Sequence, residues 1–162
     1  MENSQLNRAV PLKDMGRFRH EAIAVDPLNG FVYETEDRED GLIYRFIPNV
    51  KNNLHKGGRL QGLVIKNIFA ADCTNWKNAK FKKGKIYDVV WQNLENVDAS
   101  IDDLSGRGKH LGCAFFARGE GMWYADDYVY FTATTGGKHR LGQIWRYKHR
   151  GQKNVDGQIE LF

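Results

Sequence analysis

The sequence predicts an all-β protein, a partial β-propeller of about three blades of antiparallel strands with few or no helices. Short apolar segments rich in aromatic residues alternate with turn residues along the chain, which holds 17 glycines, seven tyrosines, nine phenylalanines and four tryptophans in 162 residues. No stretch keeps a helical period over three turns. A segment near the start of the chain also recurs near its end, and this repeat points to propeller blades.

The length and composition predict one ordered domain. Charged residues make up 27% and hydrophobic residues 41% of the chain, a balance that excludes a disordered protein. We expect a polar, extended lead-in over residues 1–15 and the propeller domain over residues 16–162. No apolar run approaches the ~18 residues of a membrane-spanning helix, so we expect a soluble chain with no membrane partner. The first ten residues lack the apolar core and the paired arginines of export signals, which leaves the compartment open.

Turn residues mark the expected strands. Residues 22–25 form the first strand, and the turn 26–30 (Asp-Pro-Leu-Asn-Gly) ends it, because proline fixes φ and Asn-Gly tolerates positive φ. A short helix is expected around residues 97–104, within a polar stretch. The further expected strands cover residues 31–33, 42–47, 59–70, 86–91, 113–117, 122–125, 128–134, 143–147 and 158–162.

The repeat relates residues 20–46 to residues 119–147. Each copy runs from a glutamate through a short strand, a turn, a Val-Tyr strand and a glycine-containing loop to an aromatic-Arg-aromatic triplet. A β-propeller repeats a four-stranded blade of about 40–50 residues, and equivalent residues recur at the same position of each blade. One more blade, built from residues 60–69 and 86–92, is therefore expected between the two copies.

The two copies place Glu21 and Glu120 at equivalent positions. The innermost strand of a propeller blade begins at the central channel, so these carboxylates would converge there. Like charges that converge need a counter-charge, and a hard cation such as Ca²⁺ or ferric iron supplies one through oxygen ligands. The alternative, that each glutamate caps a strand or forms a local ion pair, fits the spacing equally well.

Neighbouring residues extend this candidate site. Residues 34–40 hold five acidic side chains, a composition typical of a solvated loop, although their place after the Val-Tyr strand makes one of them a candidate metal ligand. Arg118 lies two residues before Glu120, and its planar fork suits a phosphate-type anion. A structural ion pair between Arg118 and Glu120 explains the same spacing. His20 adjoins Glu21 and would contact the substrate or only orient its neighbour.

Other features favour structural roles. The basic run from Lys77 to Lys85 carries five lysines and one aromatic residue, and we interpret it as a solvated loop rather than a nucleic-acid site. Cys73 and Cys113 lack the spacing of a disulfide framework or a metal knuckle, and the sequence leaves open whether they bridge each other. The stretch 132–137 (Thr-Ala-Thr-Thr-Gly-Gly) is expected to be a turn rather than an anion-binding loop.

Several stretches together resemble the PhoX-type alkaline phosphatases: GRFRHEAIAVDP (16–27), VYETEDREDGLIYRFIPN (32–49), GGRLQGL (57–63), FARGEGMWYADDYVYFTATTGG (116–137) and LGQIWRY (141–147). The resemblance implies a β-propeller with an axial cluster of calcium and ferric iron, which hydrolyses phosphate monoesters and is usually periplasmic or secreted. By motif it implies Glu21, Asp37 and Glu120 as metal ligands and Arg118 as the catalytic group that binds phosphate.

The chain departs from the family pattern in length. It lacks the region before GRFRHEA that supplies a ligand cysteine and the later blades that supply further acidic ligands, so Cys73 and Cys113 are given no metal role. A chain of 162 residues allows roughly three blades, fewer than a closed propeller has. We therefore expect a truncated or split propeller with an incomplete site and weak or no phosphatase activity of its own.

The sequence leaves three functions open. The first is metal-dependent hydrolysis of a small phosphate ester. The second is a non-catalytic propeller segment for binding or for homo-oligomeric assembly, because exposed strand edges invite pairing with missing blades or another copy. The third is a calcium-dependent lactonase-like hydrolase, which Arg118 disfavours because its fork suits phosphate better than a neutral lactone.

Overall fold

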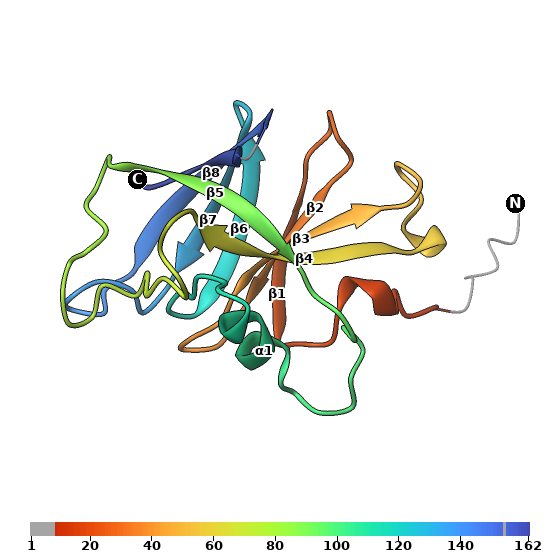
Figure 1. Ribbon diagram of the computed structural model, residues 1–162, viewed down its shortest axis with the longest axis horizontal. Coiled ribbons are helices and arrows are strands. Elements are labelled where there is room, and N and C mark those ends of the chain that lie inside the picture. Colours follow the sequence, from red (N-terminus) through yellow and green to blue (C-terminus); the bar gives the residue numbers. More distant parts are fainter. Residues whose placement is uncertain (1–8, 154) are drawn as a thin grey trace, which may run out of the picture.

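Nine strands and one short α-helix make up the described part of the chain, residues 9–153 and 155–162 of the computed structural model (Figure 1). The all-β class with few helices is confirmed. The strands are β1 (His20–Val25), β2 (Val32–Glu36), β3 (Ile43–Pro48), β4 (Gly58–Ile65), β5 (Ile86–Asn93), β6 (Gly119–Ala125), β7 (Tyr128–Ala133), β8 (Gln143–Gln152) and β9 (Val155–Leu161). Helix α1 spans Leu104–His110, and the 3-10 turns η1 and η2 span Lys13–Met15 and Leu54–Lys56.

Residues 1–8 of the expected lead-in lie outside the described residues, and η1 falls in the remainder of it. Among the described residues, no helix has the length and apolar character needed to cross a membrane.

All nine strands belong to one antiparallel sheet, in the order β1-β2-β3-β4-β5-β9-β8-β7-β6, which curls into a nearly closed barrel. Two four-stranded meanders, β1–β4 and β6–β9, form its halves. Strand β5 joins them, because it pairs with β4 on one side and with β9 on the other. The two copies of the sequence repeat supply β1–β3 and β6–β8, so the repeat corresponds to two structurally equivalent units.

The strands expected to form a middle blade complete this sheet instead. Strand β4 is the last strand of the first meander, and β5 bridges the two meanders. A two-stranded ribbon is only marginally stable in water, whereas each of these strands gains a full antiparallel ladder by joining a larger sheet. The structure therefore has two blade-like units and a bridging strand where the sequence predicts about three blades.

The two ends of the sheet meet at a junction that we call the seam, where β1 and β2 lie beside the start of β6. Here the Thr35 hydroxyl accepts a hydrogen bond from the Ala22 amide at 3.0 Å and donates one to the Glu120 carbonyl at 2.7 Å. Gly119 permits this approach, because a Cβ at its position would lie 3.3 Å from the Glu36 carbonyl oxygen. Side chains and a close backbone contact thus join the sheet ends.

Residues 113–117, expected as a strand, form an irregular buried segment. Its amides donate to carbonyl oxygens on three separate parts of the chain, those of Leu63, Ala71 and Gly41. A segment that divides its hydrogen bonds in this way is satisfied without belonging to one ladder. Its continuous run of apolar residues therefore reflects burial rather than strand pairing.

Two further elements differ in extent from the prediction. Strand β4 ends at Ile65, because Asn67 and Ala70 adopt positive φ angles of 65° and 44° and turn the chain. The helix expected around 97–104 begins only at Leu104, after a stretch of turns and bends.

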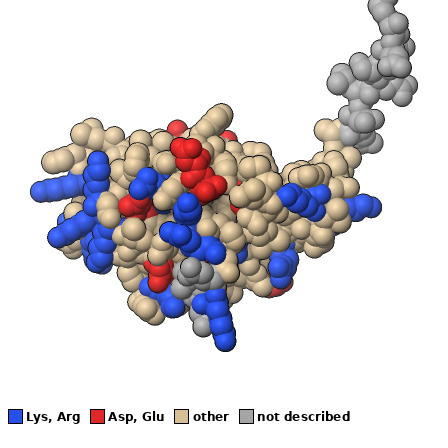
Figure 2. Space-filling model, turned by 90° about the horizontal axis from the view of Figure 1, so that it is seen from above, with Lys and Arg blue, Asp and Glu red and all other residues tan. Residues whose placement is uncertain are grey.

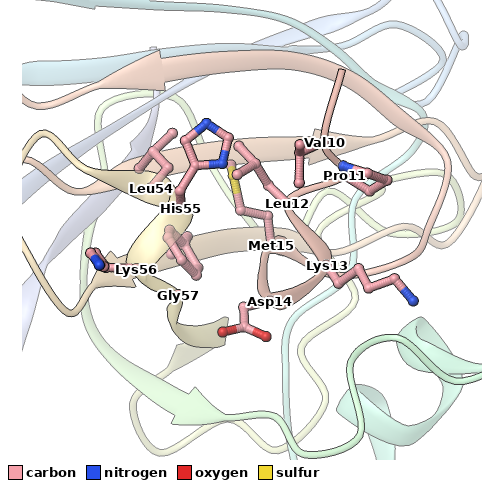
Figure 3. Close-up of a pocket in the computed structure, with 11 residues that line it drawn as sticks. Val10, Pro11, Leu12, Lys13, Asp14, Met15, Leu54, His55, Lys56 and Gly57 are labelled. Carbon is pink, nitrogen blue, oxygen red and sulfur yellow. The ribbon is translucent and has the colours of Figure 1, made fainter. Parts of the chain in front are cut away.

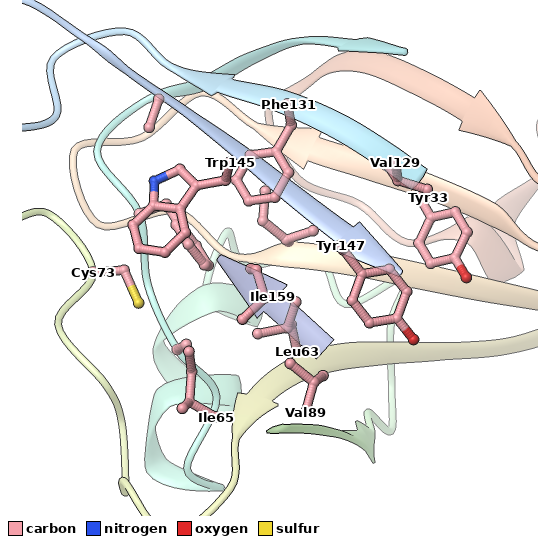
Figure 4. Packing of buried hydrophobic residues seen from close by; sticks show 14 of the residues in the cluster. Tyr33, Leu63, Ile65, Cys73, Val89, Val129, Phe131, Trp145, Tyr147 and Ile159 are labelled. Atoms are coloured by element: carbon pink, nitrogen blue, oxygen red, sulfur yellow. The ribbon is translucent and has the colours of Figure 1, made fainter. Parts of the chain in front are cut away.

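The main core fills the space between the two halves of the barrel (Figure 4). Its largest members are aromatic, and Trp145 and Phe116 are fully buried. The ring centre of Phe116 lies 5.3 Å from that of Trp145 and 5.2 Å from that of Phe131, with nearly perpendicular planes in both pairs. Edge-to-face contacts of this kind add to the burial of apolar area. One layer of aromatic side chains therefore packs against both meanders.

A second, smaller core covers the other face of the first meander. Tyr44, Phe46 and Leu60 project from that face and pack with Met15 of η1 and Leu104 of α1. The helix and the η1 turn therefore shield a sheet face that would otherwise be exposed to water.

The two cysteines are free and buried in different cores, Cys73 in the main core and Cys113 in the second. Burial raises the pKa of both thiols, that of Cys113 to about 12. The question left open by the sequence is thereby answered, since neither cysteine forms a disulfide here and both are protonated packing residues.

We expect Trp145→Ala to lower the free energy of unfolding by about 3–5 kcal/mol, because it removes a fully buried indole from the layer between the halves. Denaturant unfolding measures the change. Trp123→Ala is the matched control: that side chain is 73% exposed, so its loss should change stability by no more than about 0.5 kcal/mol. Equal effects of the two substitutions would contradict this packing.

Candidate functional site

Arg118 lies at the centre of the candidate site, directly before β6. Its Nε and Nη2 atoms donate to Oδ1 and Oδ2 of Asp37 at 2.7 and 2.9 Å, so guanidinium and carboxylate meet through two parallel hydrogen bonds. Nη2 also lies 2.9 Å from Oε1 of Glu120. Two of the three predicted metal ligands therefore contact the predicted phosphate-binding arginine.

The backbone around Arg118 fixes the origin of its side chain. Its φ of 56° lies in the left-handed region, which is uncommon for a residue other than glycine. Its amide donates to the Arg38 carbonyl at 2.8 Å, and its carbonyl accepts a hydrogen bond from the Thr134 amide at 2.9 Å. These bonds tie the arginine both to the loop after β2 and to the end of β7, so it spans the seam.

Glu120, the second residue of β6, is positioned by two threonines. The Thr134 hydroxyl donates to its Oε1 atom at 2.8 Å, and the Thr35 hydroxyl donates to its carbonyl at 2.7 Å. The local ion pair with Arg118 that the spacing allowed is therefore present. The same carboxylate remains one-third exposed, so it borders solvent as well.

The charges of the site depend on one another. Hydrogen bonds from Arg118 lower the pKa of Asp37, against the opposing effect of its partial burial. The Asp37 hydrogen bonds and charge in turn raise the pKa of Arg118, with smaller contributions from Glu120 and Glu21. The charge of Arg19 also lowers the pKa of Asp37, so the three carboxylates Glu21, Asp37 and Glu120 face two guanidinium groups.

Glu21 joins the group from β1. It is exposed, and its charge is among those that raise the pKa of Arg118. The structure thus brings Glu21, Asp37, Arg118 and Glu120 into one neighbourhood, although they come from segments far apart in the sequence. Their roles as metal ligands and catalytic group remain predictions.

His20 lies apart from this group, on the face of the second core. Its ring stacks on Phe18 with centres 3.6 Å apart, Nδ1 lies 3.2 Å from Glu34 Oε2, and Nε2 lies 3.1 Å from the Gly16 carbonyl. Burial lowers the pKa of His20, but the hydrogen bonds to Glu34 and Gly16 outweigh it and raise the pKa overall. Both ring nitrogens have protein partners in this arrangement, and the substrate-binding role of His20 stays a prediction.

Only residues 37–40 of the acidic run 34–40 form the surface loop that its composition predicts. Glu34 and Glu36 belong to β2, and both side chains are fully buried. Oε2 of Glu36 accepts hydrogen bonds from the Leu42 amide and the Tyr44 hydroxyl, both at 2.9 Å. Burial raises the pKa of both carboxyl groups. Alternation along the strand, rather than composition, decides where these acids lie.

Within residues 9–153 and 155–162, no group of three or more histidine, cysteine, aspartate or glutamate side chains is placed to hold one metal ion. Asp37 uses both oxygens on Arg118, and Oε1 of Glu120 contacts Arg118 and Thr134. Carboxylate oxygens suit hard cations such as Ca²⁺ and ferric iron. The guanidinium, however, occupies the space between the carboxylates, so these residues as placed do not fit the implied metal cluster.

Two residues that orient the site were not singled out by sequence reasoning. Thr35 lies between two glutamates, in a run that is conspicuous for its acidic residues. Thr134 lies in the stretch 132–137. Thr132 and Ala133 end β7, and residues 134–137 form the predicted turn, in which the Gly136 amide donates to the Ala133 carbonyl. The Gly137 amide donates to the Thr74 carbonyl. A strand position adjoining an acidic run is the signal that could have identified Thr35.

A cavity of about 340 Å³ lies elsewhere, between residues 10–15 and 54–57 (Figure 3). Asp14 at this cavity accepts a hydrogen bond from the Gly58 amide at 3.2 Å. None of the candidate residues lines it, so the site around Arg118 is a group of surface side chains at the seam rather than an enclosed pocket.

Fold and site together define an all-β protein of paired blade-like meanders with an arginine–carboxylate site at their junction. The chain belongs to the PhoX family: a family model described as Alkaline phosphatase PhoX matches residues 2–161. This match confirms the resemblance and includes every candidate site residue. No curated protein and no solved structure matches the chain.

We expect Thr35→Val to destabilise the protein by about 1 kcal/mol, because it leaves the half-buried Ala22 amide and Glu120 carbonyl without their shared partner. Thermal or denaturant unfolding measures the loss. Thr132→Val is the matched control, since its hydroxyl makes only an exposed 3.4 Å contact with the Gly121 carbonyl. Should the two variants unfold alike, the Thr35 bridge would have no special role at the seam.

Proposed function

We propose that this chain is a phosphatase-type protein in which Arg118 binds the phosphoryl group of a phosphate monoester. One observation carries the proposal: Nε and Nη2 of Arg118 already hold the two oxygens of a carboxylate, at 2.7 and 2.9 Å. A phosphate presents two non-bridging oxygens to the same fork. It can therefore take the place of Asp37, and a family of alkaline phosphatases supplies the reaction class.

The role of Arg118 in such a reaction is electrostatic. Negative charge on the phosphoryl oxygens must be stabilised as the ester bond breaks, and a guanidinium that is already oriented does this without rearranging. Its left-handed backbone and the Thr134 amide bond keep it oriented. Arg118 is thus both the phosphate-binding and the catalytic group of the proposal.

The surrounding acids oppose this role. Asp37 competes with phosphate for the fork, and Glu21 and Glu120 repel a dianion. We therefore propose that hydrolysis by the chain itself is weak or absent. Members of the family are typically metal-dependent, and calcium and iron are the cations that the resemblance implies. We assign them no catalytic step, because the carboxylates as placed do not fit a metal cluster.

Hydrolysis of p-nitrophenyl phosphate tests the proposal, with and without added Ca²⁺ and Fe³⁺. We expect a slow rate that Arg118→Ala lowers by about a hundredfold, because one oriented donor contributes roughly that much to a transition state. Arg118→Lys should fall between the two, since it keeps the charge and loses the fork. A wild-type rate in Arg118→Ala would contradict the assignment, and fast, Glu120-dependent turnover without additions would contradict the expected weakness.

Phosphate binding in chelator-treated protein tests the competition by Asp37. We expect Asp37→Asn to bind inorganic phosphate about tenfold more tightly than the wild type, because the amide gives up the charge that occupies the fork. Isothermal calorimetry measures the affinity, and Asp127→Asn, remote from Arg118, serves as the charge-matched control. Weaker binding by Asp37→Asn would show that Asp37 supports the phosphate site instead of competing with it.

A further inference from the structure

A basic loop contributes no residue to the proposed reaction, although its first part contacts the turn 134–137, where Trp76 Nε1 donates to the Thr135 carbonyl at 2.6 Å. The stretch 73–87 contains five lysines, Lys77, Lys80, Lys82, Lys83 and Lys85, and no acidic residue. All five are exposed, and among the described residues none forms an ion pair. Lysine and arginine side chains gather at the end of the molecule that carries this loop (Figures 1 and 2).

The lysines of the loop are exposed to solvent, as the sequence predicts, but the middle of the loop is anchored. Phe81 in its middle is 3% exposed and packs against Tyr87 and Trp145, with ring centres 4.9 and 5.8 Å away. The buried Asn75 side chain accepts from the Phe81 amide at 3.0 Å and donates to its carbonyl at 2.8 Å. The Gly84 amide donates to the Leu161 carbonyl at 2.8 Å. The lysines on either side of Phe81 are therefore held in defined places.

A cavity of about 270 Å³ opens between this loop and the turn after β4. Buried Ala71 and Phe81 form its floor, and half-buried Tyr87 lines a wall. The exposed Lys80 and Lys85 line it as well, and the Lys85 ammonium lies 5.1 Å from the Tyr87 ring centre. The cavity therefore combines an apolar interior with two cations at its opening.

One acid, Asp72, also lines the cavity, is exposed, and has one of its two oxygens hydrogen-bonded. Oδ1 accepts hydrogen bonds from the Thr74 amide at 3.0 Å and the Thr74 hydroxyl at 2.6 Å. The two lysines therefore outnumber the acid, and the electrostatic preference of the opening is for an anion.

An exposed apolar wall continues the cavity to the surface. Phe69 is 74% exposed and Ile68 40% exposed, and both line the cavity. Phe69 packs against Gly112, where an added Cβ would come within 3.2 Å of its ring. Ile68 and Phe69 thus extend the lining of the cavity with apolar side chains that are open to water.

We propose that this cavity binds a small organic anion: an aromatic ring system or short acyl chain that lies on Phe81, Tyr87 and Phe69, with a phosphate, sulfonate or carboxylate group between Lys80 and Lys85. The volume is at the small end for ligand sites and holds one or two rings. An apolar interior with a few placed charges is the usual design of such sites. This concavity favours a small molecule over a membrane or a nucleic acid, which would need a broad surface.

Calorimetric titration of the full chain with 2-naphthalenesulfonate tests the proposal, because this aromatic anion has no phosphate to hydrolyse. We expect saturable one-to-one binding, weakened about tenfold or more in Lys80→Ala/Lys85→Ala. Lys82→Ala/Lys83→Ala is the matched control. It removes the same charge from the same loop, but neither lysine lines the cavity, so affinity should change by less than about threefold.

Two further arms separate the contributions. Neutral 2-naphthol should bind about tenfold more weakly than the sulfonate if the lysines recognise the anionic group. Arg118→Ala should bind the sulfonate like the wild type, which makes the outcome independent of the proposed phosphatase function. Because all of these lysines are exposed, we expect the lysine variants to fold. Circular dichroism melting checks that every variant is folded.

Three results would overturn the proposal. The first is no binding at millimolar probe concentration. The second is an equal loss of affinity in the two lysine pairs, which would indicate diffuse charge attraction. The third is that the chain binds phosphatidylserine vesicles but not the free probe, and that Phe69→Ser abolishes the vesicle binding. This result would assign the surface to a membrane.

Discussion

Closure of the seam is the constraint on which the rest of the structure depends. A nine-stranded sheet that stops short of a complete barrel has two edge strands, and open edges are prone to pair with other chains. Here the edges are brought together by side chains, the Thr35 hydroxyl and the ion pair between Asp37 and Arg118. The aromatic core supplies most of the apolar burial, but these polar bonds determine how the two meanders meet.

The seam also explains why the functional residues lie together. Each copy of the repeat returns a glutamate to the start of its first strand, and the barrel places those two strand starts side by side. Asp37 follows β2 and Arg118 precedes β6, so the same junction collects them. The two ends of the sheet have to meet. This one geometric requirement therefore determines both the fold and the position of the candidate site.

Local patterns in the sequence predicted the parts of this arrangement that depend on near neighbours. The repeat marked the two meanders, and the spacing of Arg118 and Glu120 allowed the ion pair that forms. Strand β5 could not be placed in this way, because its partners depend on which edges the rest of the sheet leaves open. The burial of Glu34 and Glu36 was also missed, since the composition of an acidic run hides the alternation that points both side chains into the second core.

Phosphate binding and seam closure use the same guanidinium, and this has a thermodynamic consequence. A phosphate that takes the fork of Arg118 displaces Asp37 and removes one bond between the meanders, while the Thr35 hydroxyl and the bond from the Arg118 amide to the Arg38 carbonyl still hold the junction. Linkage is reciprocal, so phosphate binding weakens the Asp37–Arg118 bond by the same free energy with which that bond opposes phosphate binding. The bond that stabilises the fold is therefore the one that the proposed ligand must replace, and the acids around Arg118 determine the balance between these two states.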